Sequence, residues 1–377
     1  MIDVQEVTLF RVRKALVHEF ETSSHTKSYI EHVLVKATTA DGLVGWGEAA
    51  SPSDPFYCYE NTDTCWQILN HYLVPTLLAG AFESPEDALA ASPVNGHPFA
   101  HAASDMVMWD LFSQEQGVPL ADALGGTQEN VSAGVSLGIE KSIDELLKVV
   151  AHHVHDGYHR VKLKISPHWA YEPAKAVCET WPDVAVQVDA NGVFTASDLD
   201  NQLFNDLDRL GLLMIEQPFA MEDLLSHATL QRRLETPICL DESITSLAAL
   251  ETALFLKAAQ IINIKVSRLG GVGPAKAVHD RCHDAGVPVW CGGMHEFGVG
   301  RAANLAVASL PGFTLPSDLS GSKKYYETDI VDPEITVSKA GEIGIPDSPG
   351  RGYEVRTDLV ERLTVRKEEI RAFELVG

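Results

Sequence analysis

The sequence has few basic residues and no long apolar stretch. Its 29 lysines and arginines stand against 53 aspartates and glutamates, which gives a formal net charge of -24. This excess of negative charge repels nucleic acid and anionic membrane surfaces at long range, so we expect neither as a partner. No uncharged stretch reaches the roughly 20 apolar residues of a membrane helix. Residues 1–14 alternate like a strand and lack the apolar core of a signal peptide, so secretion is not expected either.

Paired cysteine motifs and a dinucleotide fingerprint are also missing. No CxxC occurs among the six cysteines, and two of them lie inside predicted strands, which favours buried, reduced thiols and a cytoplasmic location. These residues are Cys58, Cys65, Cys178, Cys239, Cys282 and Cys291. No GxGxxG follows the first strand of the repeating region in the middle of the chain, which removes the main sign of a doubly wound dinucleotide-binding fold.

The first third of the chain predicts a small α+β domain, since a length of 377 residues allows about two domains. Three antiparallel strands are expected, and three helical segments follow them. The polar segments between these elements, 18–28 and 51–61, are expected to be loops, and the first is either a lid or an ordinary surface loop. The strands are predicted at 7–13, 32–39 and 43–50, and the helices at 62–80, 84–91 and 98–116.

The middle of the chain is periodic. Strand-like runs begin near 131, 160, 184, 212, 238, 261, 288 and 313, at intervals of about 23 to 29 residues, which is one strand plus one helix. We therefore predict an α/β fold, a modified TIM-type (β/α)7β barrel. Its capping domain combines the N-terminal segment with the C-terminal tail, and the predicted parts are residues 1–128, 129–327 and 328–377.

Three acidic residues end consecutive strands of this barrel. Asp189, Glu216 and Asp241 close the runs that begin near 184, 212 and 238, and the carboxyl ends of barrel strands form the active-site face. Three converging carboxylates repel one another unless a cation lies among them, and oxygen-only ligands favour Mg²⁺ first and Mn²⁺ second. The alternative is three separate acids paired with arginine or lysine. Asn191 and Glu242, beside these acids, are expected to orient the carboxylates.

Two lysines end strands on either side of the acids. Lys164 closes the second strand and Lys265 the sixth, so they face each other across an eight-stranded ring. We expect burial and nearby positive charge, from Lys162 and the cation, to lower the lysine pKa values toward working pH. The alternative is that the lysines form structural salt bridges. A cation with flanking amines suits removal of a proton α to a carboxylate through an enediolate, and then either racemisation or loss of a leaving group.

The chain resembles the enolase superfamily, muconate cycloisomerase subgroup. The resemblance covers nearly the whole chain. Its motifs are KxK at 162–164, DAN at 189–191, EQP at 216–218, DES at 241–243 and the lysine at 265. Residues 291–320 are similar to the family of o-succinylbenzoate synthases and N-acylamino acid (N-succinylamino acid) racemases. The resemblance implies that Lys164 and Lys265 are the acid/base pair and that Lys162 supports Lys164 and the oxyanion.

The resemblance also implies a substrate site. Ser136 and the backbone around Gly292, Gly293 and Met294 would hold the succinyl or acyl group, and Tyr57 and the 18–28 segment with Phe20 would close over it. Arg268 resembles the racemase members, although an arginine that caps the following loop explains it equally well. A small-molecule carboxylate is the expected substrate and a homo-oligomer, dimer or octamer, the expected assembly.

The implied activities are N-succinylamino acid racemisation, o-succinylbenzoate synthesis by dehydration in menaquinone biosynthesis, or both. Two other enzyme activities remain as alternatives: that of a dipeptide epimerase and that of a muconate cycloisomerase-type enzyme. Dipeptide epimerases usually carry Asp-x-Asp where this chain has Met294, His295 and Glu296, which counts against the first. A barrel that binds a carboxylate without turnover is the alternative from another class of protein.

Overall fold

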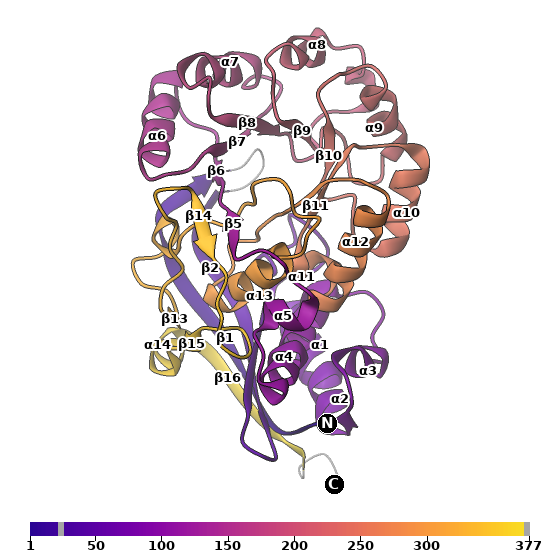
Figure 1. Cartoon of the computed structure of the whole chain (residues 1–377), viewed down its shortest axis with the longest axis vertical. Coiled ribbons are helices and arrows are strands. Elements are labelled where there is room, and N and C mark those ends of the chain that lie inside the picture. Colours follow the sequence, from indigo (N-terminus) through magenta and orange to yellow (C-terminus); the bar gives the residue numbers. More distant parts are fainter. Residues whose placement is uncertain (22–25, 373–377) are drawn as a thin grey trace.

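The structure is a computed structural model that describes residues 1–21 and 26–372, apart from the side chains of residues 20, 21 and 26. Two parts of the molecule lie one above the other in Figure 1. The middle of the chain forms a curled sheet surrounded by helices, and the N-terminal region with the end of the described chain forms a cap beneath it. No helix in the described ranges is both long and apolar enough to cross a membrane.

The cap is built on an antiparallel sheet in the order β16-β1-β2-β3, with β4 paired to the start of β1. The three strands predicted near the N-terminus are present, and β1 and β2 are longer than predicted. The edge strand β16 comes from the C-terminal segment and lies along residues 6–12 of β1. The bounds are β1 (Ile2–Glu21), β2 (Thr26–Thr39), β3 (Val44–Ala49), β4 (Ala81–Phe82) and β16 (Thr364–Arg371).

The predicted loop at 18–28 is wrong at both of its ends. Strand β1 continues to Glu21 and β2 begins at Thr26, and their backbones pair at Phe20 with Lys27. The register shifts between Ala15 and Phe20, so a bulge interrupts the alternation by which a strand is recognised in a sequence. The described ends of this segment therefore form a two-stranded arm that extends the sheet.

The cap helices match their predicted positions, with one interruption. The first predicted helix is divided by a π-helical turn that ends just before Pro75. Proline has no N–H to continue the regular ladder, which explains a change of hydrogen-bonding pattern there. The bounds are α1 (Thr62–Ile68), the π turn η1 (Leu69–Leu73), α2 (Val74–Leu78), α3 (Pro85–Ala90), α4 (Pro98–Gln116) and, at the end of the cap, α5 (Leu120–Leu124).

The barrel sheet has seven parallel strands in sequential order, β6 to β12, which confirms the predicted fold class. The bounds are β6 (Val135–Leu137), β7 (Arg160–Lys164), β8 (Ala185–Asp189), β9 (Met214–Glu216), β10 (Ile238–Leu240), β11 (Ile261–Ile264) and β12 (Val289–Cys291). The first predicted strand is divided, because β5 (Asn130–Ser132) turns away to pair with β14 (Glu342–Gly344).

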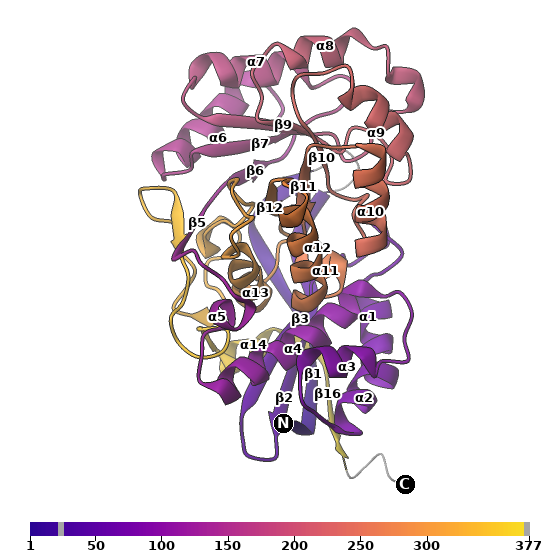
Figure 2. The ribbon, with the colours of Figure 1, turned by 45° about the vertical axis from the view of Figure 1, so that its right-hand side comes forward.

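Helices follow the barrel strands along the chain and cover the outside of the sheet, as Figure 2 shows. They are α6 (Ile143–His155), α7 (Tyr171–Thr180), α8 (Gln202–Asp208), α9 (Leu224–Gln231), α10 (Leu247–Leu256), α11 (Val266–Leu269), α12 (Val272–Asp284) and α13 (Gly298–Ala308). Between α13 and β16 the chain forms a 3-10 turn, short strands and one more helix: η3 (Ser322–Lys324), β13 (Val331–Asp332), β14, β15 (Glu354–Val355) and α14 (Thr357–Leu363). A further 3-10 turn, η2 (Ala196–Asp198), precedes α8.

The segment 313–318 fills the eighth position of the ring. It makes a parallel bridge to β12 through Val289 and Phe313, and another to the start of the barrel through Ala133 and Ser317. Pro316 lies within it and cannot donate a ladder hydrogen bond. The ring is therefore closed by isolated bridges where a full strand was predicted.

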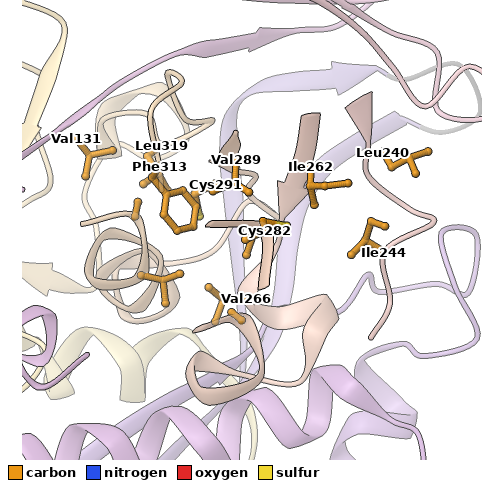
Figure 3. Close-up of a cluster of buried hydrophobic side chains, with 14 of the residues drawn as sticks. Val131, Leu240, Ile244, Ile262, Val266, Cys282, Val289, Cys291, Phe313 and Leu319 are labelled. Atoms are coloured by element: carbon orange, nitrogen blue, oxygen red, sulfur yellow. The ribbon is translucent and has the colours of Figure 1, made fainter. Parts of the chain in front are cut away.

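Alternation along the strands separates the inside of the ring from the outside. Apolar side chains on the outer face pack against the helices in one large buried cluster, part of which is shown in Figure 3. Leu240, Ile262 and Val289 in that view belong to three neighbouring strands. Met214, Cys239 and Trp290 form a separate buried group with Ile261. The charged side chains share this inner side, toward the ends of the strands.

Candidate active site

Three acids meet at the carboxyl ends of β8, β9 and β10. Asp189, Glu216 and Asp241 are buried, and each has a carboxylate oxygen within 4.8 Å of the others'. The backbone register explains this, because Asp189 pairs directly with Glu216 and Asp241 follows β10 immediately. The sequence placed these acids on one arc of the rim, and the structure brings the three together.

The electrostatic surroundings of the three acids differ. Burial, reinforced by repulsion from Asp189, raises the pKa of Glu216 to about 8. Burial also acts to raise the pKa of Asp241, but Lys265 and Arg268 outweigh it and hold that pKa below its usual range. In the same way, Lys164 and Lys162 overcome the burial of Asp189 and lower its pKa. The lysines and Arg268 therefore favour the ionised forms of Asp189 and Asp241, whereas burial favours the protonated form of Glu216.

Two lysines approach this acidic group from opposite sides. Lys164 Nζ lies 2.5 Å from Asp189 Oδ2, and Lys265 Nζ lies 2.9 Å from Asp241 Oδ2. Strands β8, β9 and β10 separate their strands in the sheet. Lys162 Nζ lies deeper, 3.1 Å from Glu216 Oε2 and 3.3 Å from Asp189 Oδ2. Amines therefore flank the acids on both sides, as the sequence predicted, and each also forms the ion pair that was the alternative.

The expectation that the pKa values of the two flanking lysines are lowered is wrong for Lys265 in the metal-free structure. Burial does lower the pKa of Lys265, but attraction to Asp241 outweighs burial and raises it. Burial of Lys162 is likewise outweighed by Asp318 and Glu216, so its pKa lies well above the usual value. The sequence argument counted neighbouring cations and missed how close the carboxylates lie.

A cavity of about 330 Å³ lies at the mouth of the barrel, and the three lysines line it. The barrel supplies most of its wall, and the cap supplies the rest through strand β2 and the 51–61 loop. Twenty residues line the cavity, among them Lys27, Phe56, Tyr57, Ser136, Lys162, Lys164, Asn191, Glu242, Lys265, Gly293, Met294, His295 and Asp318. The cavity lies at the face of the barrel where catalytic groups gather in this fold.

The residues expected to orient the acids all contact them or one another. Asn191 donates its backbone N–H to Asp189 Oδ1 at 2.9 Å, and its side-chain amide donates to Glu242 Oε1 at 2.9 Å. Arg268 forms a close ion pair with Asp241 and also donates to the carbonyl oxygen of Ile244 at 3.0 Å. Arg268 thus contacts a residue of the acid group and also holds the following loop, as an arginine that caps that loop would.

The predicted substrate residues lie around the cavity, with two exceptions. Ser136, Gly293, Met294 and Tyr57 line it, and the Tyr57 hydroxyl lies 3.4 Å from Lys265 Nζ. Gly292 lies behind the wall, where an added Cβ would be 2.3 Å from Asn263 Oδ1. The side chain of Phe20, the other predicted contact, lies outside the described residues; its backbone belongs to β1.

Among the charged residues that line this cavity, sequence reasoning missed Glu222, Asp318 and Lys27. Asp318 follows the last barrel segment and bridges Lys162 Nζ at 2.6 Å and Arg160 Nη1 at 2.5 Å. The rule that charges end barrel strands would have found Asp318, had it been applied to the run at 313. Lys27 lies in the segment predicted as a loop, and no pattern there distinguished it from a solvated residue.

The acid group fits a divalent cation. Its donor set consists only of carboxylate oxygens, which suits a hard ion such as Mg²⁺, Mn²⁺ or Ca²⁺. Three buried acids this close to one another also require positive charge among them, and Lys162, Lys164, Lys265 and Arg268 supply it in the described structure. The residues present can therefore hold a divalent metal.

The fold and the site define a barrel enzyme with a group of buried acids that can hold a metal ion, and the family models agree. Residues 145–359 match the enolase C-terminal domain-like family, and residues 4–125 match the N-terminal domain of the mandelate racemase / muconate lactonizing enzyme family. A solved structure of an enolase superfamily member from Listeria innocua superimposes with a TM-score of 0.94 at 33% identity, and covers 99% of this chain and 100% of that one.

Two curated relatives narrow the family. An o-succinylbenzoate synthase from Geobacillus stearothermophilus is 44% identical over 364 residues, 96% of each chain. An N-succinylamino acid racemase from Amycolatopsis sp is 45% identical over 368 residues, 96% of this chain and 97% of the relative. The chain therefore belongs to the enolase superfamily, in the family of o-succinylbenzoate synthases and N-succinylamino acid racemases, which confirms the resemblance seen in the motifs.

Proposed function

We propose that this protein removes the α proton of a carboxylate substrate with the help of a divalent metal, and that it racemises N-succinylamino acids. The observation that carries the proposal is the pair of lysines on opposite flanks of one acid group. Racemisation requires an acid/base group on each face of the α carbon, whereas dehydration requires only one. Mg²⁺ is the proposed metal, with Mn²⁺ as its substitute, and Asp189, Glu216 and Asp241 are the proposed ligands.

The proposed chemistry divides between the cation and the lysines. A divalent cation held by the three acids supplies positive charge that stabilises the enediolate formed when the α proton leaves. One lysine, Lys164 or Lys265, takes the proton at its Nζ atom, and the other delivers a proton to the opposite face. Lys162 keeps a fixed positive charge beside the substrate carboxylate, which its raised pKa supports. Ser136, Gly293, Met294 and Tyr57 are proposed to position the acyl group.

A second activity, o-succinylbenzoate synthesis, is favoured by the relative from Geobacillus stearothermophilus. In that reaction one lysine removes a proton and the β hydroxyl group leaves as water, so the same acids and one lysine suffice. We propose that both reactions use this one site. They share proton removal and differ in the step after it.

Exchange of the substrate α hydrogen with deuterated solvent tests the lysine assignment. With Mg²⁺ and an N-succinylamino acid, we expect the intact protein to exchange both enantiomers. Lys164→Ala should lose exchange with one enantiomer by at least about 10²-fold and keep part of it with the other, and Lys265→Ala should show the reverse. Lys148→Ala, at an exposed lysine on α6, is the control and should exchange both.

No exchange by the intact protein with any N-succinylamino acid or with the o-succinylbenzoate precursor would favour a carboxylate-binding barrel without turnover. Loss of exchange with both enantiomers in one lysine variant, and with neither enantiomer in the other variant, would instead refute the two-face assignment, because a single base would then serve both faces. The stereochemical pattern therefore separates a racemase from an enzyme with one base.

Four further features belong to this proposal. We propose a cytoplasmic location, because the six cysteines are free thiols and the cytoplasm is reducing. We propose a homo-oligomer, dimer or octamer, and a functional division of the chain into residues 1–128, 129–327 and 328–377. The substrate is a small carboxylate.

A further inference from the structure

Lys27 is a cation on the cap side of the cavity. It lies at the start of β2, on the arm that β1 and β2 form, and its side chain lines the cavity. Its Nζ atom lies 5.3 Å from the centre of the Phe56 ring, which comes from the other cap segment over the site. Phe56 stabilises the ammonium by a cation–π contact.

The surroundings of Lys27 differ from those of the other cavity lysines. Lys162, Lys164 and Lys265 each have a carboxylate oxygen at 2.9 Å or less from their Nζ atoms. For Lys27, no ion pair with an acid occurs within the part of the chain that the structure describes. Burial, with repulsion from Lys265 and Lys164, lowers the pKa of Lys27 to about 8, and Glu296 offsets this only in part. The amine is thus close to two other cations and has no anion of its own.

A partly buried cation in this position is costly unless a ligand supplies negative charge. The α-carboxylate of the proposed substrate cannot be that ligand, because its place is beside the acids and Lys162, on the barrel side. Lys27 lies on the opposite, cap side of the same cavity. An N-succinyl substrate carries a second carboxylate at the far end of its acyl chain, and that group is free to reach the cap.

We propose that Lys27 binds a second anionic group of the substrate, the carboxylate at the far end of its acyl chain, and so makes the site selective for dianionic substrates. The inference rests on the proposed function for the identity of the substrate. The ammonium of Lys27 donates charge-assisted hydrogen bonds to the remote carboxylate, and an acyl group without charge gains nothing from it. The arm formed by β1 and β2 thereby recognises the charge of the acyl group, and the barrel carries the residues that move the proton.

Paired substrates test this selectivity. With Mg²⁺ present, we expect Lys27→Met to lower kcat/KM for N-succinylmethionine by about 10- to 100-fold, mainly through KM, and to change kcat/KM for N-acetylmethionine by less than about threefold. Lys27→Arg should restore most of the N-succinyl activity, because it returns the charge. Lys36→Met, on the same strand and outside the cavity lining, should leave both substrates unaffected.

Binding without turnover separates this inference from the proposed function. N-succinyl-2-aminoisobutyrate has no α hydrogen, so calorimetry with this compound and its N-acetyl analogue measures recognition alone. Weaker binding of the N-succinyl compound to Lys27→Met, with the N-acetyl compound unchanged, supports the role of Lys27 even if no substrate is turned over. Equal effects on both compounds, or no effect on either, would overturn it.

Discussion

Asp318 connects two buried cations inside the barrel. One oxygen pairs with Arg160 and the other with Lys162, and both partners lie on β7. Because of this contact, Lys162 is shared between Asp318 and the acid group. The position of the Lys162 amine is therefore set by four side chains: Asp318, Glu216, Asp189 and the Trp290 ring below it.

Replacement of Asp318 tests this link. Asp318→Asn removes the charge that both cations share, and we expect a loss of about 3 kcal/mol in the free energy of unfolding, because a buried charge left without its partner is costly. Urea denaturation measures the loss. Asp200→Asn, which breaks an exposed pair with Arg233, is the control and should leave stability unchanged. Equal stabilities of the two variants would contradict a structural role for Asp318.

Gly292 acts on the acids through a neighbour. An added Cβ would lie 2.3 Å from Asn263 Oδ1, and Asn263 Nδ2 donates to Glu216 Oε1 at 3.0 Å. We expect Gly292→Ala to displace Asn263 and to weaken Mg²⁺ binding about tenfold, as loss of groups that orient metal ligands does. Titration calorimetry measures the affinity.

Gly293→Ala is the matched control for that experiment. Its added Cβ would lie 3.3 Å from the nearest atoms, the Asp318 carbonyl oxygen and Glu296 Oε2, so small shifts accommodate it. Unchanged Mg²⁺ affinity in Gly292→Ala would show that the contact with Asn263 relaxes without moving Glu216.

The charged residues differ in how far the sequence predicts them. Asp189, Glu216 and Asp241 end regular strands, so strand alternation is enough to place them on one face. Asp318 ends a segment that is held by isolated bridges, and Lys27 follows a bulged strand. The end of the strand-like run at 313 marks Asp318 in the sequence, but where the backbone loses its regular period, as near Lys27, a sequence pattern cannot assign a side chain to a face.

Glu48 connects the cap to a barrel helix. It lies on β3, and its two carboxylate oxygens accept the backbone N–H groups of Phe297 and Gly300, each at 2.8 Å. These groups are at the start of α13, whose own first residue provides no side-chain cap. His32 Nδ1 lies 2.6 Å from the same carboxylate. A residue of the cap therefore satisfies donors that the barrel helix leaves open.

We expect Glu48→Ala to lower the free energy of unfolding by about 2 to 3 kcal/mol, since it leaves two buried N–H groups without acceptors. Thermal denaturation should show a lower Tm. The Tm should fall for the unfolding of the cap and for the unfolding of the barrel. Glu354→Ala, at an exposed glutamate, is the control. A normal Tm for Glu48→Ala would mean that water replaces the carboxylate.

The elements themselves were largely predictable. Helix α4 was predicted at its observed bounds because its apolar residues recur with helical spacing and Gly117 ends it. The division of the first barrel strand was not predictable, because it depends on a distant contact. The first barrel strand divides near Gly134, where a Cβ would be 2.3 Å from the guanidinium carbon of Arg160, and no local signal in residues 131–139 indicates that neighbour.

The three acids of the proposed metal site lie close together only because of the tertiary structure. Asp189, Glu216 and Asp241 come from three strands, so they converge only when the barrel is formed. A cation that binds all three binds the folded protein and not the unfolded chain. By linkage, saturating metal at 100 times its Kd stabilises the fold by about 2.7 kcal/mol.

The size of this stabilisation should depend on pH through Glu216. Its pKa is about 8 in the folded protein without metal and 4.5 as the ordinary value. Between these values the folded state keeps a proton that the unfolded chain has lost, so this group makes the metal-free protein less stable as pH rises toward 8. A cation must also displace that proton, so metal affinity rises over the same range. Asp189 and Asp241 stay ionised throughout, since their pKa values are lowered.

As pH rises, the metal-free protein becomes less stable and the metal affinity becomes higher. We therefore expect Mg²⁺ to raise Tm by more at pH 8 than at pH 6. Thermal denaturation with EDTA and with excess Mg²⁺, at each pH, measures the difference. Glu216→Gln cannot ionise, and its Mg²⁺-dependent shift should be smaller and independent of pH. An equal shift at both pH values in the intact protein would mean that Glu216 is already ionised in the metal-free fold, and a full shift in Glu216→Gln would remove Glu216 from the metal site.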